Sequence, residues 1–192
     1  LLPGLQARIQ SDAGLFTLAG PITNNAAGLI SILGGAGNYL VSGVVTGSGA
    51  LGKDGGGTAT LTAANQYLGG TYIYNGTLSL DFSAPGAPQQ NILNPATGSV
   101  NMNGGTLRAI SASSGGSTQS FVNAFNVGVG NNALVASNTP GGTMTVNLTV
   151  NGMGRAVGAG TIDVSGNGTV NMMSGTNIAG LHGSFITVNR SN

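Results

Sequence analysis

The sequence contains no cysteine, no tryptophan and no glutamate, and only 5% of its 192 residues are charged. The absence of cysteine excludes disulfide bonds and thiolate metal sites. A net charge of +1 gives no electrostatic basis for binding nucleic acid or anionic membranes. No apolar run approaches the roughly 18 residues that a transmembrane helix needs. Since so few charges repel neighbouring copies, the composition favours self-association.

Glycine is abundant instead, with 36 residues, and the dipeptide Gly-Thr recurs along the chain. Alternating apolar and polar residues follow most of these glycines, which predicts short half-buried strands that leave a corner. The threonines of these dipeptides are Thr58, Thr71, Thr77, Thr106, Thr143, Thr161, Thr169 and Thr176. Further strands are predicted at Leu15–Leu18, Leu29–Leu33, Tyr39–Val45, Thr71–Tyr74, Phe121–Val129 and Ser184–Val188. No helical period is found, so the fold class is all-β.

Many short strands fit a sandwich, a barrel or a β-solenoid. The recurrence of one corner motif favours the solenoid, in which each coil stacks on the next. Coils of about 20 residues or more would give about nine at most, and the irregular spacing of the motifs predicts unequal coils with loops. We predict a single solenoid domain over residues 1–192, with a surface loop at 83–98 where proline and glycine cluster.

The stretch GSGALGKD, residues 47–54, comes within one residue of a phosphate-binding P-loop and also contains G-x-G-x-x-G. A P-loop needs a helix after its lysine, so that backbone amides and the helix dipole face the phosphates. The residues after Lys53 read DGGGTATLT, which is typical of a strand, and Asp54 stands where a hydroxyl should face magnesium. We therefore interpret the stretch as a lookalike and predict no nucleotide cofactor.

The residues that follow Lys53 are more informative about the fold. Residues 53–78 read KDGGGTATLTAANQYLGGTYIYNGTL. This segment closely resembles the autotransporter-associated β-strand repeat, K-x-G-x-G-T-x-T-L-x-x-x-N-x-Y-x-G-G-T-x-[IV]-x-x-G-T-L. The matching residues, in register without a gap, are Lys53, Gly55, Gly57, Thr58, Thr60, Leu61, Asn65, Tyr67, Gly69, Gly70, Thr71, Ile73, Gly76, Thr77 and Leu78. Departures from the usual small or hydroxyl residues occur at Ala59, Leu68 and Tyr74.

The resemblance implies a right-handed parallel β-helix (β-solenoid) from a large exported bacterial protein, located at the cell surface or outside the cell. In such a repeat the glycines turn corners, Asn65 caps backbone groups at a bend, and Tyr67 covers a coil edge. The repeat itself carries no catalytic residue. Because the chain starts at Leu1 without methionine, we expect a processed product or a fragment.

Residues that carry chemistry are sparse. His182 is the single histidine and lies in a glycine-rich turn, where a surface role is expected rather than that of a base. A solenoid would bring Asp81 near Arg108, or Asp163 near Arg155, and parallel β-helices host carbohydrate-acting enzymes, which use paired carboxylates or an arginine base. An enzyme is therefore our third hypothesis. We nevertheless predict no catalytic residue, no metal site and no cofactor, because candidate ligands are not clustered.

Threonine strings at residues 58–62 and 143–145 raise an ice-binding interpretation, which the lack of a fixed period disfavours. The leading hypothesis is a structural extracellular protein, a solenoid subunit that assembles with copies of itself into a surface filament, sheath or layer. The alternative is an adhesive passenger segment of a longer autotransporter-like rod, with neighbouring solenoid segments and surface glycans as partners. Tyr67, Tyr72 and Tyr74 are predicted to share one outer strip and to serve self-association or glycan contact.

Overall fold

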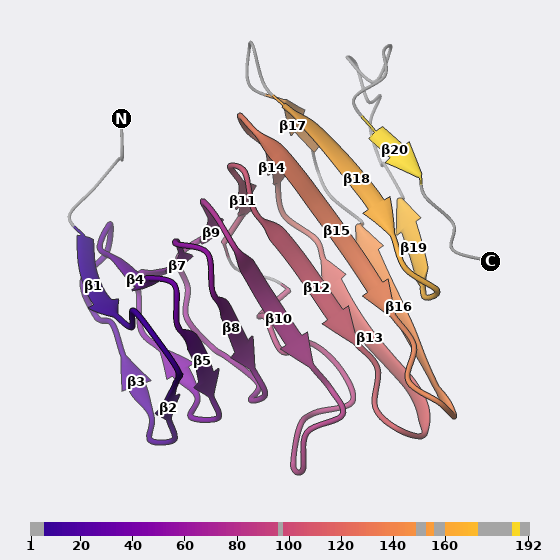
Figure 1. Cartoon of the computed structure of the whole chain (residues 1–192), viewed down its shortest axis with the longest axis horizontal. Coiled ribbons are helices and arrows are strands. Elements are labelled where there is room, and N and C mark those ends of the chain that lie inside the picture. The colour runs from indigo at the N-terminus through magenta and orange to yellow at the C-terminus, as the bar shows by residue number, and fades with distance from the viewer. Residues whose placement is uncertain (1–5, 96–97, 149–152, 156–159, 173–185, 189–192) are drawn as a thin grey trace.

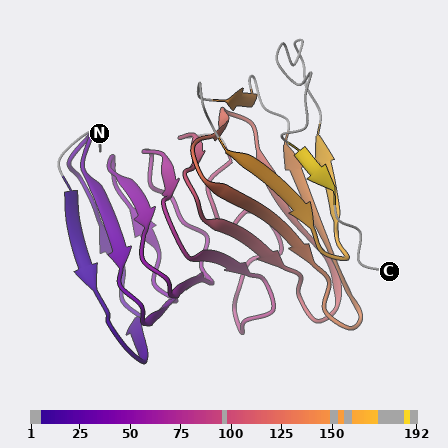
Figure 2. The same ribbon diagram turned by 45° about the horizontal axis from the view of Figure 1, so that its top comes forward.

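The computed structural model describes residues 6–95, 98–148, 153–155, 160–172 and 186–188, and in this part of the chain all regular structure is β-strand. Every strand pairs with its neighbours in parallel, at a separation of one coil along the chain. The strands stack from the N-terminal end on the left to the C-terminal end on the right (Figure 1), and a 45° turn shows the same succession (Figure 2). The predicted all-β solenoid is confirmed.

Two long sheets form the sides of the solenoid. In the described residues, sheet A contains seven strands: β1 (Gln6–Gln10), β4 (Ile30–Gly34), β7 (Ala50–Lys53), β9 (Thr71–Ile73), β11 (Val100–Met102), β14 (Phe125–Val127) and β17 (Met153–Arg155). Sheet B contains eight: β2 (Leu15–Leu18), β5 (Asn38–Val41), β8 (Thr58–Leu61), β10 (Thr77–Asp81), β12 (Thr106–Ile110), β15 (Asn131–Ser137), β18 (Thr161–Ser165) and β20 (Ile186–Val188).

A third face closes each coil between sheet B and the next strand of sheet A. Its regular strands in the described residues are β3 (Ile22–Thr23) and β6 (Val45–Thr46) at the N-terminal end, and β13 (Gly115–Phe121), β16 (Gly142–Leu148) and β19 (Thr169–Met172) at the C-terminal end. Between them, irregular backbone continues the stacking, since the amide of Asn65 donates to the carbonyl of Ile92. Each coil therefore has three faces separated by corners.

The coils are unequal, as the irregular motif spacing predicted. In sheet B, Tyr39 pairs with Ala59, a step of 20 residues, and Ala59 pairs with Leu78, a step of 19. The next step, from Leu78 to Leu107, is 29 residues. The additional residues of the later coils lie in loops and in the longer strands of the third face.

The predicted surface loop at 83–98 agrees with the structure in its first part, but not at Ile92 and Leu93. Residues 83–90 follow β10 and are half-buried or exposed, as expected. Ile92 and Leu93, in contrast, are buried in the hydrophobic core. The proline and glycine signals mark the loop correctly, but after it the chain returns to the third face. There the side chain of Gln119 in the next coil bonds both the amide and the carbonyl of Leu93.

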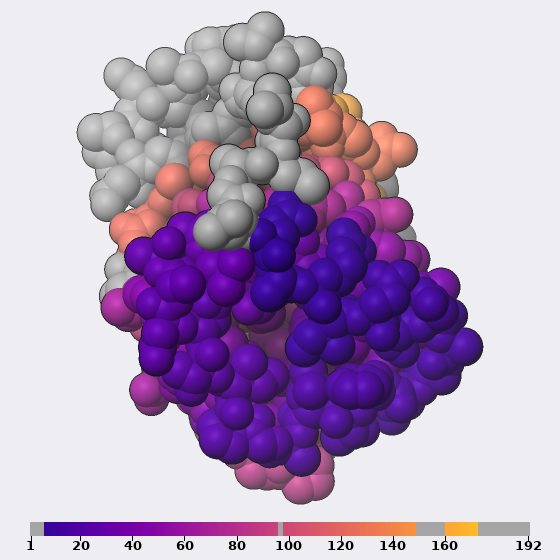
Figure 3. All heavy atoms as spheres, turned by 90° about the vertical axis from the view of Figure 1, so that its left-hand side faces the viewer, coloured from indigo at the N-terminus to yellow at the C-terminus, as the bar shows by residue number. Residues whose placement is uncertain are grey.

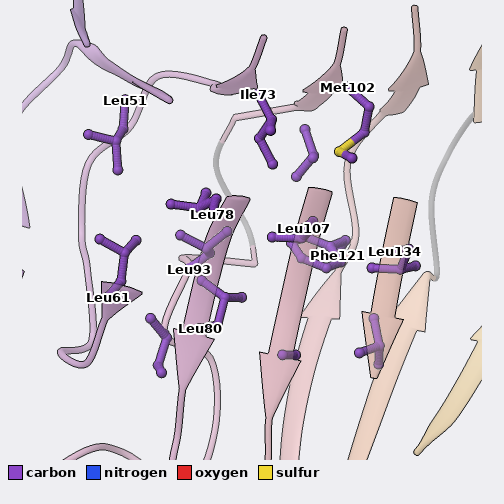
Figure 4. Close-up of a cluster of buried hydrophobic side chains, with 14 of the residues drawn as sticks. Leu51, Leu61, Ile73, Leu78, Leu80, Leu93, Met102, Leu107, Phe121 and Leu134 are labelled. Atoms are coloured by element: carbon purple, nitrogen blue, oxygen red, sulfur yellow. The ribbon is translucent and has the colours of Figure 1, made fainter. Parts of the chain in front are cut away.

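Aliphatic side chains from all three faces meet in one continuous core. Leu51, Ile73 and Met102 point inward from sheet A, and Leu78 and Leu107 point inward from sheet B (Figure 4). Because side chains alternate between the two faces of a strand, each inward position stacks on its equivalent in the next coil. The stacked apolar side chains stabilise each coil against the next, which explains how a chain with so few charges and no disulfide can form an elongated solenoid.

Asn65, a matching residue of the repeat-like segment 53–78, joins three successive coils through its side chain. This buried side chain accepts a hydrogen bond from the amide of Val45 in the preceding coil (2.8 Å). It donates to the carbonyl of Ala63 (2.9 Å) and to that of Ile92 in the following coil (3.0 Å). The expectation that Asn65 caps backbone groups at a bend is confirmed.

Candidate functional site

The outer surface of sheet A carries an unusual apolar patch. In a one-layer wall, alternate side chains should face water, yet strands β4 and β7 are buried on almost all positions. Ile30, Ile32 and Ala50 project outward and form a cluster separate from the main core. Tyr72 and Tyr74, from and just after β9, pack against this cluster and cover it. The outer face of sheet A is therefore built up as a second small hydrophobic layer.

The two tyrosine rings form a pair whose centroids are 6.1 Å apart with an interplanar angle of 15°. Gly52 leaves room for the Ile30 and Ile32 side chains on this face, since a Cβ at this position would lie 3.0 Å from Ile30 and 3.1 Å from Ile32. The hydroxyl of Tyr74 is buried without a hydrogen-bond partner. Burial raises the pKa of Tyr74, and Tyr72 and Asp54 raise it further. Both rings are held by packing.

A shallow groove of about 350 Å³ lies beside this pair. Tyr72, Ile30 and Ala50 form its apolar walls, and the remaining lining residues are Gly28, Ser48, Gly69 and Gly70. None of these side chains is charged. The Ser48 hydroxyl donates to the carbonyl of Asn25 (2.7 Å), which fixes its oxygen. The groove thus offers one aromatic ring, backbone and a single hydroxyl.

An ion pair lies near the tyrosine pair. Arg8 of β1 donates to Asp54 across a separation of two coils, with a distance of 2.6 Å. The Arg8 guanidinium holds the pKa of the Asp54 carboxyl below its usual value. The side chain of Arg8 crosses the intervening coil at Gly34, where any Cβ would overlap the guanidinium. The two charges neutralise each other, so the groove is bordered by no net charge from this pair.

The predicted outer strip of three tyrosines is wrong for Tyr67. This residue is 3% exposed, and its hydroxyl lies 2.6 Å from that of Thr71 inside the solenoid. Burial raises its pKa. The corner at Gly69 and Gly70 separates the two segments and resets the alternation, so that Tyr67 faces inward on the third face while Tyr72 and Tyr74 face outward on sheet A.

Lys53, the lysine of the P-loop-like stretch, is buried at a corner of the solenoid. Lys53 is 1% exposed, and its Nζ donates to the backbone carbonyls of Asp54 (2.7 Å) and Gly55 (2.8 Å) at the corner that follows β7. Burial lowers its pKa to about 8. The ammonium points into the solenoid and is therefore not placed to contact a phosphate outside it.

Asp81 and Arg108, the first of the charged pairs considered from sequence, do not form an ion pair in the described residues. Asp81 accepts hydrogen bonds from the amide and hydroxyl of Ser83 rather than from Arg108. The side chain of Arg155 and all of His182 lie outside the described residues. In the same part of the chain no three metal-ligating side chains cluster, and no helix is long and apolar enough to cross a bilayer.

The threonine strings align only partly. Thr58, Thr77 and Thr106 stack in register on sheet B. The adjacent outward column, however, contains a serine and then an arginine at the positions opposite Thr60. A flat two-column threonine surface does not form on these strands, so the ice-binding interpretation finds no support there.

Sequence reasoning identified Tyr72 and Tyr74 but missed the groove beside them. Its other lining residues are glycine, alanine, serine and isoleucine, which carry no chemical signature. One signal was present. The run LISIL at residues 29–33 lacks alternation, which is typical of a strand buried on both faces. In a single-walled solenoid, the outer face of such a strand must be covered by side chains from neighbouring coils or by a binding partner.

Comparison with known proteins gives one relative. The chain is 33% identical over 174 residues to the adhesin BmaC autotransporter of Brucella suis biovar 1 (strain 1330), and the alignment covers 88% of this chain. The chain spans about 5% of the length of that protein. No family model matches the chain, and no solved structure matches it.

Proposed function

We propose that this chain is an adhesive segment of a longer, exported autotransporter-like rod, displayed at the bacterial cell surface. The observation that carries the proposal is the 33% identity to an autotransporter adhesin across 88% of the chain. The β-solenoid architecture agrees with this role, because stacked coils extend a binding surface away from an anchor. Adhesion requires binding surfaces only, so the proposal assigns no catalytic activity and no cofactor to the chain.

A direct test couples the purified chain to fluorescent beads and measures their attachment to cultured mammalian epithelial cells. Beads carrying the folded chain are expected to attach several-fold more than beads carrying the same chain after thermal unfolding, and free folded chain should compete. Beads coated with an unrelated, charge-poor β-protein control for nonspecific contact. Equal attachment of all three bead types would refute the adhesive role.

The filament subunit is the second candidate, and one observation favours it. In the described residues, strands β1, β2 and β3 each lie at the end of their sheets, and apolar side chains of the first coil are exposed beside them. An open edge of this kind can pair with another chain. The same edge would equally stack against a preceding coil of a longer rod, which the adhesive proposal implies. The similarity to an adhesin therefore places the filament second.

A further inference from the structure

The groove on the outer face of sheet A has the size and the aromatic lining of a ligand site. Its volume of about 350 Å³ lies within the range of small-molecule sites. It extends over three successive coils, from Gly28 through Ser48 to Gly69. At about 4.8 Å per coil, this corresponds to roughly 10 Å along the solenoid axis. The groove is therefore elongated across several strands.

The wall formed by Tyr72 is rigid before any ligand arrives. Tyr72 is paired with Tyr74, and both pack on Ile30, Ile32 and Ala50. A preorganised ring loses little conformational entropy on binding. The face of an aromatic ring carries negative potential, so it attracts the polarised C–H groups on the apolar face of a sugar ring.

The composition of the groove argues against the other common ligand classes. Nucleic acid and sulfated or sialylated polymers are anionic and favour cationic side chains, and the lining residues have none. An extended peptide adds to a sheet at an exposed edge, whereas this groove lies on the face of strands that are paired on both sides. What remains is a neutral ligand with one flat apolar face and several hydroxyl groups.

We propose that the groove beside Tyr72 binds a neutral pyranose disaccharide unit of a surface glycan, with one sugar ring stacked on Tyr72. The Ser48 oxygen, whose hydroxyl donates to Asn25, and the Gly70 carbonyl, which accepts the Leu51 amide, each keep a lone pair that can accept from a sugar hydroxyl. Gly70 also keeps the site open, since a Cβ there would lie 3.1 Å from the Tyr72 ring. This assignment rests on the adhesive function proposed above and names the ligand class of its binding surface.

The test uses saturation-transfer difference NMR on the whole chain with a panel of soluble sugars. The neutral probes are lactose, cellobiose, maltose and N,N′-diacetylchitobiose, and the charged comparators are 3′-sialyllactose and a heparin disaccharide. We expect transfer to at least one neutral probe and weaker or no transfer to its charged counterparts. Transfer to none of the neutral probes, or to charged probes alone, would overturn the proposal.

Three variants locate the binding. Tyr72→Ala should weaken the neutral sugar at least tenfold, and Tyr72→Phe, which keeps the ring, should retain most of the affinity. Because Tyr72→Ala also uncovers the apolar patch, Ala50→Leu provides an independent test that fills the groove instead. Ala133→Leu makes the same change at a half-buried, outward-facing position of sheet B and is the matched control. Binding that survives both Tyr72→Ala and Ala50→Leu would contradict the assignment.

The two proposals fail in distinguishable ways. If beads carrying the chain attach to cells but no neutral sugar binds, the groove assignment is wrong and the adhesive function stands on another surface. If a neutral sugar binds in the groove but the beads do not attach, the site exists and adhesion through it does not.

Discussion

At the residue scale, Lys53 shows how the same side chain is interpreted differently in sequence and in structure. It is the only lysine of the chain. In sequence it completes a phosphate-binding lookalike, whereas in the structure its ammonium is buried and bonded to two backbone carbonyls of its own corner. A buried cation with no carboxylate among its hydrogen-bond partners is destabilising when charged, which is the origin of its lowered pKa.

This burial predicts how stability depends on pH. The pKa of Lys53 is about 8 in the folded chain, against 10.5 for an unperturbed lysine. Between these values the unfolded chain binds more protons than the folded chain, so the free energy of unfolding should rise as pH rises. From pH 7 to pH 9.5 we expect a gain of about 1–2 kcal/mol, measured by urea unfolding at each pH.

Tyrosine limits this gain at higher pH. The pKa values of Tyr39, Tyr67 and Tyr74 are raised by burial in the folded chain, so their contribution is full below about pH 10 and is lost as pH rises further. Lys53→Met is the matched control, because its stability should be flat between pH 7 and pH 9.5. A single ¹³Cε signal reports the lysine pKa directly, and a titration midpoint near 10.5 would contradict the burial argument.

At the element scale, the corner between sheet A and sheet B determines whether coils can stack. A column of glycines with positive φ follows sheet A in successive coils, namely Gly35, Gly55, Gly76, Gly104 and Gly130. Gly76 combines two requirements, since its φ is +67° and a Cβ there would overlap the carbonyl oxygens of Gly55 and Gly57. Backbone of one coil thus lies directly on backbone of the next, and a side chain would separate them.

Gly76→Ala should therefore lower the free energy of unfolding by about 2–4 kcal/mol, because strain at positive φ adds to a backbone clash. Gly86→Ala, at φ +79° with nothing within 4 Å, should cost only the strain, about 1 kcal/mol. Gly56→Ala has neither problem and should change stability by less than about 0.5 kcal/mol. Chemical denaturation of the three variants measures this order, and equal effects at Gly76 and Gly56 would show that the corners do not govern stacking.

At the scale of the whole molecule, the first coil exposes the end of the core. Phe16 faces inward, in register with the buried Tyr39, and is still 43% exposed. Figure 3 looks onto this end, where the atoms of the first coils surround a hollow. Apolar surface beside unpaired strand edges favours association with another coil, either from a longer chain or from a second molecule.

The isolated chain should accordingly associate in a concentration-dependent way through its first coil. Phe16→Lys should abolish this association, because a charge would be placed at the open core end. Leu15→Lys is the matched control, since Leu15 is 65% exposed and lies on the outer face, in register with Asn38. Sedimentation velocity measures the size distribution, and negative-stain electron microscopy distinguishes fibres from short rods. Short rods that stay monomeric at high concentration would exclude the filament hypothesis.

The β-solenoid could be predicted because its determinants are local. Each coil repeats a glycine corner followed by a strand with alternating side chains, and both signals occupy a few consecutive residues. The Gly-Thr corners before Thr77 and Thr106 therefore marked β10 and β12 correctly. Asn65 was assigned to a bend through the resemblance of residues 53–78 to the autotransporter-associated repeat, and its hydrogen bonds agree with that assignment.

The sequence could not determine whether a side chain after a corner faces the core or the solvent. The alternation of inward and outward side chains does not continue across a corner, and the new orientation depends on how the neighbouring coils stack. The predicted strand at Phe121–Val129 in fact crosses such a corner, between β13 and β14. Tyr67 turned inward, Tyr72 outward, and Ile92 entered the core after a loop. The groove exists only because three coils bring distant glycines beside one tyrosine, and that proximity is set by the stacking register rather than by any local pattern.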